Sequence, residues 1–87
     1  MIDIDIKNQL NSRTSKVLKF IKKNPGCNMK NISNETGIDY NFVSKIVMRC
    51  EEEKMVKTKM NNREKIITLE NKGVKITTLL EEVEKLL

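Results

Sequence analysis

Five residues between positions 33 and 46 constrain this 87-residue chain more than any other feature. Two helices that cross steeply over a tight turn need a small residue where their backbones approach, and Ser33 is such a residue. They need a glycine four residues later for the turn itself, Gly37, and an apolar residue to fill the corner, Ile38. Two apolar residues must then face inward from the second helix, and Val43 and Ile46 have that spacing. The set predicts a helix-turn-helix.

A first helix is predicted over TSKVLKFIKKN, residues 14–24. Asn11 or Ser12 can serve as its N-cap, and Pro25 followed by Gly26 ends it, because proline cannot continue a helix. The preceding IDIDIK alternates like a strand, although the same residues can extend the helix backwards, and both possibilities stay open. The apolar stripe of this helix consists of Val17, Leu18 and Ile21, and its outward lysines are Lys16, Lys19, Lys22 and Lys23.

Capping residues define the next two helices. Asn28 is the N-cap expected for Met29–Thr36, and Gly37 lies where a helix commonly exits in a left-handed conformation. Asp39 is the N-cap expected for a third helix over residues 40–53, because its carboxylate also suits the positive end of the helix dipole. The inward positions of that helix are Val43, Ile46, Val47 and Cys50.

After residue 54 the apolar period changes from 3.6 to 2, and MVKTKM-NN-REKIITL predicts a β-hairpin. We expect Asn61 and Asn62 to form a two-residue turn, since asparagine tolerates positive φ. That turn sets the expected register: Val56 opposite Ile67, Thr58 opposite Lys65 and Lys59 opposite Glu64.

The last segment, residues 71–87, predicts a helix with more apolar residues on one side than a small domain usually needs. That stripe either folds back on the first helix or pairs with a second copy, and we expect a homodimer formed through residues 1–12 and 71–87. The fold class is mainly α with a small β-hairpin, in the order helix-helix-helix-hairpin-helix, within one domain spanning residues 1–87. The stripe consists of Ile76, Leu79, Leu80, Val83, Leu86 and Leu87.

Charge is distributed unevenly along the chain. The net charge is +5, but residues 13–75 alone hold fifteen bases and seven acids, a balance of +8. A basic middle favours an anionic partner such as nucleic acid. No run of apolar residues is long enough to span a membrane and no signal peptide is evident, so we expect a cytoplasmic protein that does not bind membranes.

The residue types needed for catalysis are missing. The chain has no histidine, no glycine-rich phosphate loop and no nucleophile placed beside a base, so we expect no enzyme activity, small-molecule substrate, cofactor or metal site. Cys27 and Cys50 stand 23 residues apart without a CxxC motif, and we interpret them as small core residues, with a disulfide as the alternative.

At these motifs the chain resembles the winged-helix regulators, in particular the small single-domain archaeal type related to the multiple-antibiotic-resistance regulators. The resemblance covers residues 12–87 and rests on Ile32-Ser33, Gly37-Ile38-Asp39, CEEEKMV at residues 50–56 and LENKG at residues 69–73. Lys54 replaces the glycine usual between the recognition helix and the hairpin, and Glu70 replaces the usual capping threonine.

The resemblance implies a sequence-specific regulator that binds double-stranded DNA. Helix 40–53 would enter the major groove, and the basic hairpin around residues 57–65 would reach the backbone or minor groove. Phe42 is expected to pack beneath its helix, and Arg13 is expected to add a phosphate contact. The alternative function is a winged helix used as a protein-interaction module. The candidate DNA-binding residues are Tyr40, Asn41, Ser44, Lys45, Arg49, Lys57, Lys59, Asn61, Asn62, Arg63, Lys65 and Lys30.

Overall fold

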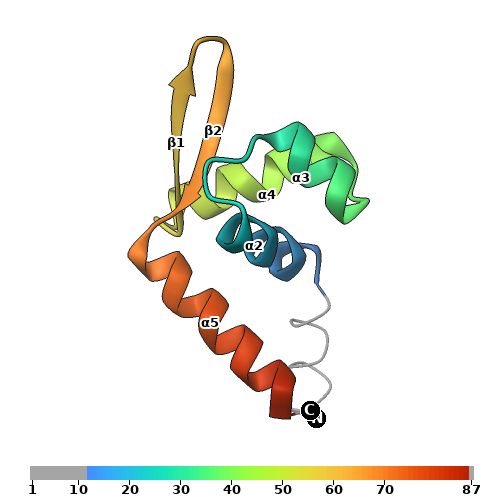
Figure 1. Ribbon diagram of the computed structural model, residues 1–87, viewed down its shortest axis with the longest axis vertical. Coiled ribbons are helices and arrows are strands. Elements are labelled where there is room, and N and C mark those ends of the chain that lie inside the picture. Colours follow the sequence, from blue (N-terminus) through green and yellow to red (C-terminus); the bar gives the residue numbers. More distant parts are fainter. Residues whose placement is uncertain (1–11, 87) are drawn as a thin grey trace.

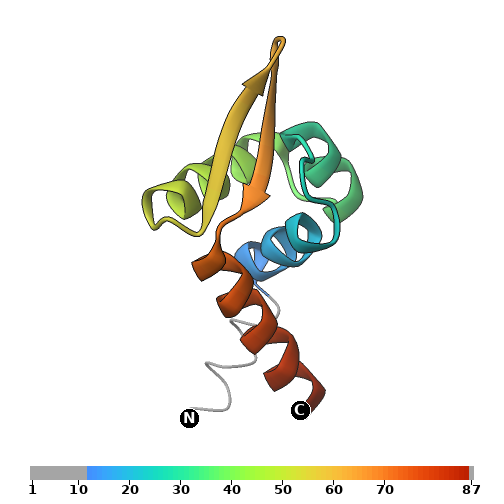
Figure 2. The same ribbon diagram turned by 60° about the vertical axis from the view of Figure 1, so that its left-hand side comes forward.

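The computed structural model describes residues 12–86 as three helices, a two-stranded antiparallel hairpin and a long last helix. The hairpin projects at one end of the molecule, and the last helix runs away from it towards the other end (Figures 1 and 2). This is the predicted order of elements, and it is the winged helix-turn-helix fold. The elements are α2 (Arg13–Lys23), α3 (Met29–Thr36), α4 (Tyr40–Glu52), β1 (Val56–Asn61), β2 (Glu64–Leu69) and α5 (Asn71–Leu86). The open question about IDIDIK lies outside the described residues.

Each of the first three helices begins at a predicted cap. The hydroxyl of Ser12 accepts a hydrogen bond from the Ser15 amide, and the Asn28 side chain accepts one from the Asn31 amide. Asp39 accepts a hydrogen bond from the Asn41 amide at 3.0 Å. A cap of this kind satisfies an amide that the helix itself leaves unpaired, so these short helices have defined starts.

The turn between α3 and α4 is built as its sequence predicts. Gly37 adopts φ 74°, a left-handed conformation that glycine reaches without steric cost. Ser33 is half-buried and its hydroxyl donates to the carbonyl of Ile38 at 2.6 Å, which ties the end of α3 to the start of α4. Ile38, Val43 and Ile46 are buried.

The core is aliphatic and lies where α2, α3, α4 and the base of the hairpin meet. Both cysteines are buried in it as free thiols, which confirms their interpretation as core residues. Burial raises the pKa of the Cys27 and Cys50 thiols, so both stay protonated. The buried hydrophobic residues of α2 and α3 are Val17, Leu18, Ile21, Met29 and Ile32.

The predicted hairpin register is wrong. Asn62 and Arg63 form the turn, with Asn62 at φ 60°, and Asn61 pairs with Glu64 as the last residues of the two strands. The turn lies one residue later than expected, so each residue of β1 pairs with a β2 residue two positions later in the sequence than predicted. The observed pairs include Val56 with Leu69, Thr58 with Ile67 and Lys59 with Ile66.

An isolated backbone bridge, which the sequence analysis does not predict, joins the hairpin to the loop after α2. Cys27 pairs with Ile67 of β2 in an antiparallel bridge, and the Ile67 amide donates to the Cys27 carbonyl at 2.8 Å. Gly26 donates its amide to the Ile67 carbonyl at 3.0 Å. These bonds hold β2 against the loop between α2 and α3, so the base of the hairpin is fixed to the helical body.

The chain passes from α4 to β1 through Lys54, which adopts φ 61°. The winged-helix regulators that the sequence resembles usually have glycine at this position. At a positive φ, a lysine has an unfavourable contact between its Cβ and the backbone. The turn therefore keeps its shape at a local steric cost.

The last helix approaches the residue before β1 through a glycine and is joined to α2 by ion pairs. Gly73 and Thr77 are its buried residues, and an added Cβ at Gly73 would lie 2.1 Å from the carbonyl oxygen of Met55. This close approach sets which face of α5 points inward. Lys19 pairs with Glu84 and Lys22 pairs with Glu81 across the two helices.

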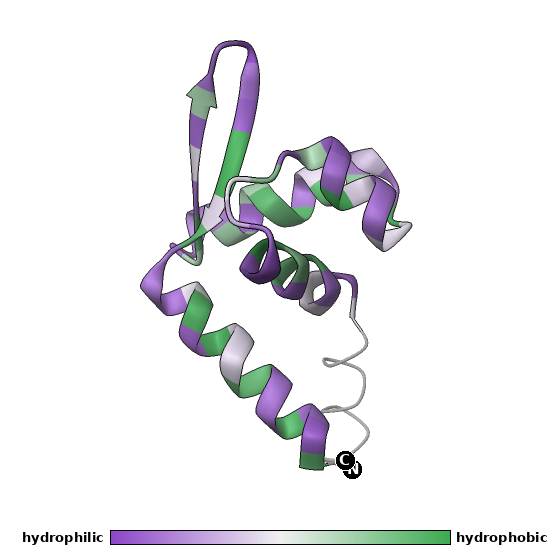
Figure 3. Ribbon diagram, viewed as in Figure 1, coloured by the Kyte–Doolittle hydropathy of each residue, from purple (hydrophilic) through white to green (hydrophobic). Residues whose placement is uncertain are grey.

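The predicted apolar stripe of α5 is divided: Ile76, Leu80 and Val83 are half-buried, and Leu79 and Leu86 are exposed. Leu80 packs against the core, whereas Leu79 is 58 % and Leu86 is 86 % exposed. Figure 3 shows hydrophobic positions recurring along α5 between hydrophilic ones. Within residues 12–86, no helix is long and apolar enough to cross a membrane.

Candidate nucleic-acid interface

None of the twelve candidate residues is buried. Ser44 and Lys65 are half-buried, and the other ten are exposed. Eleven of them form three groups: the outer face of α4, the edges of α4, and the two faces and tip of the hairpin. The twelfth, Lys30, lies in the first turn of α3. We call the exposed side chains of α4 together with the hairpin the α4–hairpin surface.

The outer face of α4 is set by its buried stripe. Val43 and Val47 are fully buried, and a helix turns 100° per residue, so Asn41, Lys45 and Met48 lie on the opposite side. Met48 is 53 % exposed. This face presents an amide, an ammonium group and a thioether to solvent near the N-terminal half of the helix.

One edge of α4 faces the hairpin. The Thr58 hydroxyl on β1 donates to the Glu51 carboxylate at 2.6 Å, and this places Glu51 beside the strand. Ser44 lies on the same edge, two turns before Glu51, and Tyr40 lies one turn further towards the N-terminus. Ser44 and Tyr40 therefore border the space between α4 and the hairpin.

The other edge of α4 carries Phe42 and Arg49, which are seven residues apart. The prediction that Phe42 packs beneath the helix is wrong: the ring is 43 % exposed and the Arg13 guanidinium lies 4.8 Å from its centroid. Core space on this side is already filled by Val43 and Ile46, so the ring is turned outward and stacks with the cation. Because Arg49 lies on this edge, it is on the side of α4 away from the hairpin, whereas Ser44 is on the side next to the hairpin.

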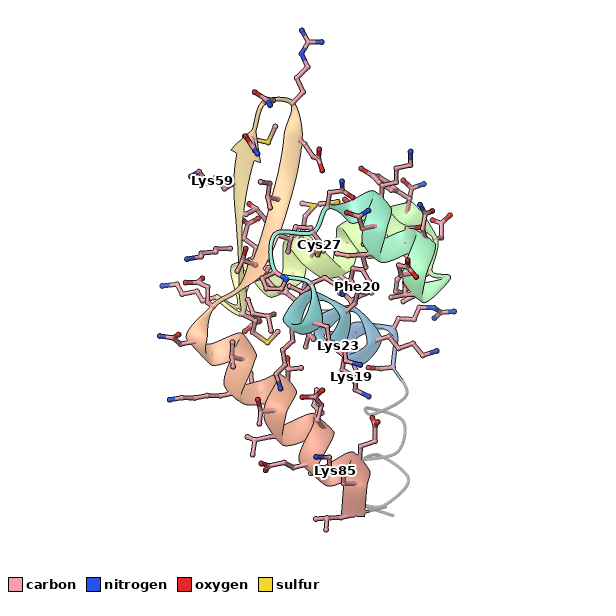
Figure 4. The ribbon with its side chains drawn as sticks, in the orientation of Figure 1. Lys19, Phe20, Lys23, Cys27, Lys59 and Lys85 are labelled. Carbon is pink, nitrogen blue, oxygen red and sulfur yellow. The ribbon has the colours of Figure 1, made fainter. Side chains whose placement is uncertain are left out.

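The two faces of the hairpin differ. In the observed register Lys57, Lys59 and Asn61 share the face directed away from the core, and Figure 4 shows Lys59 pointing away from the helices. Lys65 pairs with Met60 on the opposite face, above the buried Ile67. Asn62 and Arg63 form the exposed tip, which is hydrophilic in Figure 3.

The first turn of α3 adjoins the hairpin through a side-chain contact. The Asn28 amide donates to the carboxylate of Glu64, the residue after the tip. Lys30 follows two residues later in the first turn of α3 and is exposed. This contact is a feature that the sequence pattern alone did not predict.

Electrostatics separate this surface from the rest of the molecule. The ion pairs of residues 12–86 both join α2 to α5, and none of them involves a base of α4 or the hairpin. Two of the acids at this surface, Glu51 and Glu64, accept hydrogen bonds from the neutral donors Thr58 and Asn28. The cationic groups are thus available to an anionic ligand. No group of three His, Cys, Asp or Glu side chains within residues 12–86 is arranged to hold a metal.

The fold and this basic surface together define a DNA-binding domain of the winged-helix class. A family model described as winged helix-turn-helix DNA-binding matches residues 10–57, more than half of the chain. The chain belongs to this family, which is one of DNA-binding domains rather than enzymes. No curated protein matches the chain closely enough to count as a relative.

Solved structures show the same fold. AF1382 from Archaeoglobus fulgidus is 23 % identical, with a TM-score of 0.82 over 92 % of this chain and 94 % of that one. The PcaV transcriptional regulator from Streptomyces coelicolor is 18 % identical, with a TM-score of 0.77 over 82 % of this chain and 52 % of PcaV. A MarR-family regulator from Rhodococcus sp. RHA1 is 20 % identical, with a TM-score of 0.77 over 88 % of this chain and 56 % of that protein. The chain therefore spans nearly all of AF1382 and about half of the two regulators.

Proposed function

We propose that this protein is a transcriptional regulator that binds double-stranded DNA sequence-specifically, with α4 in the major groove and the hairpin on the backbone or in the minor groove. The observation that carries this proposal is the α4–hairpin surface, where bases without ion-pair partners within residues 12–86 adjoin an exposed helix face. Family membership and the likeness to PcaV and a MarR-family regulator support it.

In this arrangement the two parts of the surface have different tasks. Asn41 is exposed in the first turn of α4, where its amide can pair with the N6 and N7 atoms of adenine, and Ser44 and Lys45 reach neighbouring edges or phosphates. Arg63 at the hairpin tip enters the minor groove or contacts phosphate. Lys57 and Lys59, on the face of the hairpin directed away from the core, neutralise DNA phosphates. Lys30 adds a phosphate contact from α3.

The protein acts as a homodimer in this proposal, through residues 1–12 and 71–87. Val74 and Leu79 are 40 % and 58 % exposed on α5 and line a shallow hollow of about 370 Å³, which a second copy would cover. A twofold axis at this end places two α4 helices about 34 Å apart, one turn of DNA. Leu79→Lys should convert the dimer into a monomer in sedimentation experiments, and an unchanged dimer would contradict this interface.

The experiment that tests DNA binding is selection of bound sequences from a random duplex pool, followed by affinity measurements at two salt concentrations. A palindromic consensus is expected, together with a loss of affinity of about 10³-fold between 50 and 200 mM salt, because each neutralised phosphate releases counterions. Binding that is absent, or that does not respond to salt, would instead favour a protein-interaction module. If the binding responds to salt but the selection yields no consensus sequence, the protein binds DNA without sequence specificity.

A further inference from the structure

The two edges of α2 carry similar lysines but have different surroundings. On one edge Lys19 and Lys22, three residues apart, pair with Glu84 and Glu81 of the acidic helix α5. The adjoining edge presents Lys16, Phe20 and Lys23 at positions i, i+4 and i+7, and neither Lys16 nor Lys23 has an ion pair within residues 12–86. The second edge thus carries lysines that lack the acidic partners of the first edge within residues 12–86.

This second edge borders a trough between α2 and α3. One hollow of about 340 Å³ is lined by Lys16, Lys19, Phe20, Lys23, Glu35 and Thr36. A second hollow of about 540 Å³ shares Phe20 and Glu35 with the first and continues past Asn24, Pro25 and Asn31. We call the two together the α2–α3 trough.

The trough lies on a different side of α3 from the DNA-binding surface. Ser33 marks the edge of α3 that faces α4, because its hydroxyl donates to Ile38 at the turn. Asn31 and Glu35 lie on the opposite edge, beside α2. Lys19, Phe20 and Lys23 lie along α2, well apart from Lys59 of the hairpin (Figure 4). A molecule seated in the trough would leave the α4–hairpin surface free for DNA.

We propose that the α2–α3 trough binds an acidic amphipathic segment of a partner protein. Lys16 and Lys23 are about 10 Å apart along the helix, so they match two carboxylates seven residues apart on a helical partner. Phe20, half-buried between them, offers an aromatic contact to an apolar side chain of the same face. Glu35 on the α3 side repels a third acid, so the partner's acidic edge faces α2 and a neutral or basic residue faces α3.

The shape of the trough favours a peptide over a small anion. The two hollows adjoin end to end along the helices, and their walls combine cations, an aromatic ring, a proline and side-chain amides rather than one enclosed cluster of donors. A segment lying along the trough contacts all of these groups together, whereas a small anion reaches one or two lysines in water, where such pairs contribute little.

The test is a selection of random twelve-residue peptides on the full chain, with counter-selection on the double variant Lys16→Gln/Lys23→Gln. The expected consensus has two acids seven positions apart, with a bulky apolar residue three or four positions from each of them. An enriched peptide should shift amide resonances of residues 16–36 in ¹⁵N-labelled protein, and the double variant should weaken its binding about five- to tenfold at low salt. The control is Lys54→Gln between α4 and β1, which removes a lysine charge outside the trough, the candidate DNA-binding residues and α5, and should weaken binding less than twofold.

Three outcomes would overturn the proposal. One is a selection that yields no enrichment or a consensus without acids. A second is a set of shifted resonances on α4 and the hairpin, which would mean that the peptide mimics DNA. The third is a DNA affinity that falls much further in Lys16→Gln/Lys23→Gln than in Lys54→Gln, which would make Lys16 and Lys23 part of the DNA surface. Circular dichroism should show that both variants fold, since the three lysine side chains lie outside the buried core.

Discussion

The contact between α2 and α5 and the α4–hairpin surface use lysine and glutamate in opposite ways. Between α2 and α5 each lysine of the ion pairs is matched by a glutamate, and Gly73 lets α5 approach the backbone of Met55 beside it. At the α4–hairpin surface the bases have no such partners within residues 12–86, and Glu51 and Glu64 bond to neutral side chains. Charges that are paired internally stabilise the fold, whereas unpaired ones remain available for a ligand. Changes at the first region should therefore alter stability and changes at the second should alter DNA binding.

Gly73→Ala should give the largest effect of any single substitution. A Cβ at this position would lie 2.1 Å from the Met55 carbonyl oxygen and 3.0 Å from its carbon, which is backbone that cannot move without displacing β1 from α5. We expect a loss of at least about 3 kcal/mol in the free energy of unfolding and a fall in Tm of more than about 10 °C. Urea unfolding followed by circular dichroism measures the change.

Gly37→Ala is the matched control for this substitution. Gly37 has open space around its Cβ position but a φ of 74°, so only the conformational cost of about 1 kcal/mol applies. Equal losses for the two alanine variants would contradict the close approach at Gly73.

Arg63→Ala and Asn41→Ala should separate the two parts of the DNA-binding surface while leaving stability unchanged. Loss of Arg63 at the hairpin tip should weaken binding to all sequences alike and reduce the slope of log K against log salt by about one. Loss of Asn41 should remove about 1–3 kcal/mol of discrimination at one base position and leave the salt slope as it was. Fluorescence anisotropy with the selected duplex and single-site variants of it measures both quantities, and the reverse pattern would exchange the assigned roles.

Glu81 should make stability depend on pH in the acid range. The hydrogen bond from Lys22 lowers the pKa of the Glu81 carboxyl below its ordinary value of 4.5, so the stabilisation is fully present above that pH. It is lost as the pH falls through the lowered pKa of the folded state. Glu81→Gln should therefore reduce the stability at pH 7 and flatten the decline between pH 5 and 3, as measured by thermal unfolding across that range. Glu82→Gln, an exposed neighbour on the outer side of α5, should leave the profile close to that of the unaltered protein.

The helices could be predicted from the sequence because their signals are local. Ser12, Asn28 and Asp39 act within one turn of the amides they cap, and Gly37 adopts its conformation regardless of distant contacts. The hairpin register was not predictable in the same way. Shifting β2 by two residues keeps every side chain on its face and replaces Val56–Ile67 by Val56–Leu69, so the apolar pattern fits both registers equally well.

The sequence predicts which face of α4 is exposed at the candidate site, but it does not predict which edge of α4 adjoins the hairpin. The buried stripe of α4 determines that Asn41 and Lys45 point outward, and this follows from helical period alone. Which edge of α4 adjoins the hairpin depends on tertiary packing, through the Thr58–Glu51 bond on one side and the Arg13–Phe42 contact on the other. Arg49 and Ser44 were therefore indistinguishable in the sequence, although they lie on opposite edges.

Lys54→Gly should give the smallest effect, and it tests the junction that links the two regions compared above. Lys54 lies between α4 and β1 at φ 61°, where glycine has no Cβ to clash, although glycine also gains freedom in the unfolded chain. The balance should be a stabilisation of about 0.5 kcal/mol, seen as a small rise in the urea midpoint with an unchanged m-value. DNA affinity should stay within twofold, because Lys54 follows the C-terminal end of α4, away from Asn41 and Arg63. A destabilised variant would mean that the lysine side chain makes a compensating contact, and a large loss of DNA affinity would mean that the junction controls the angle between α4 and the hairpin.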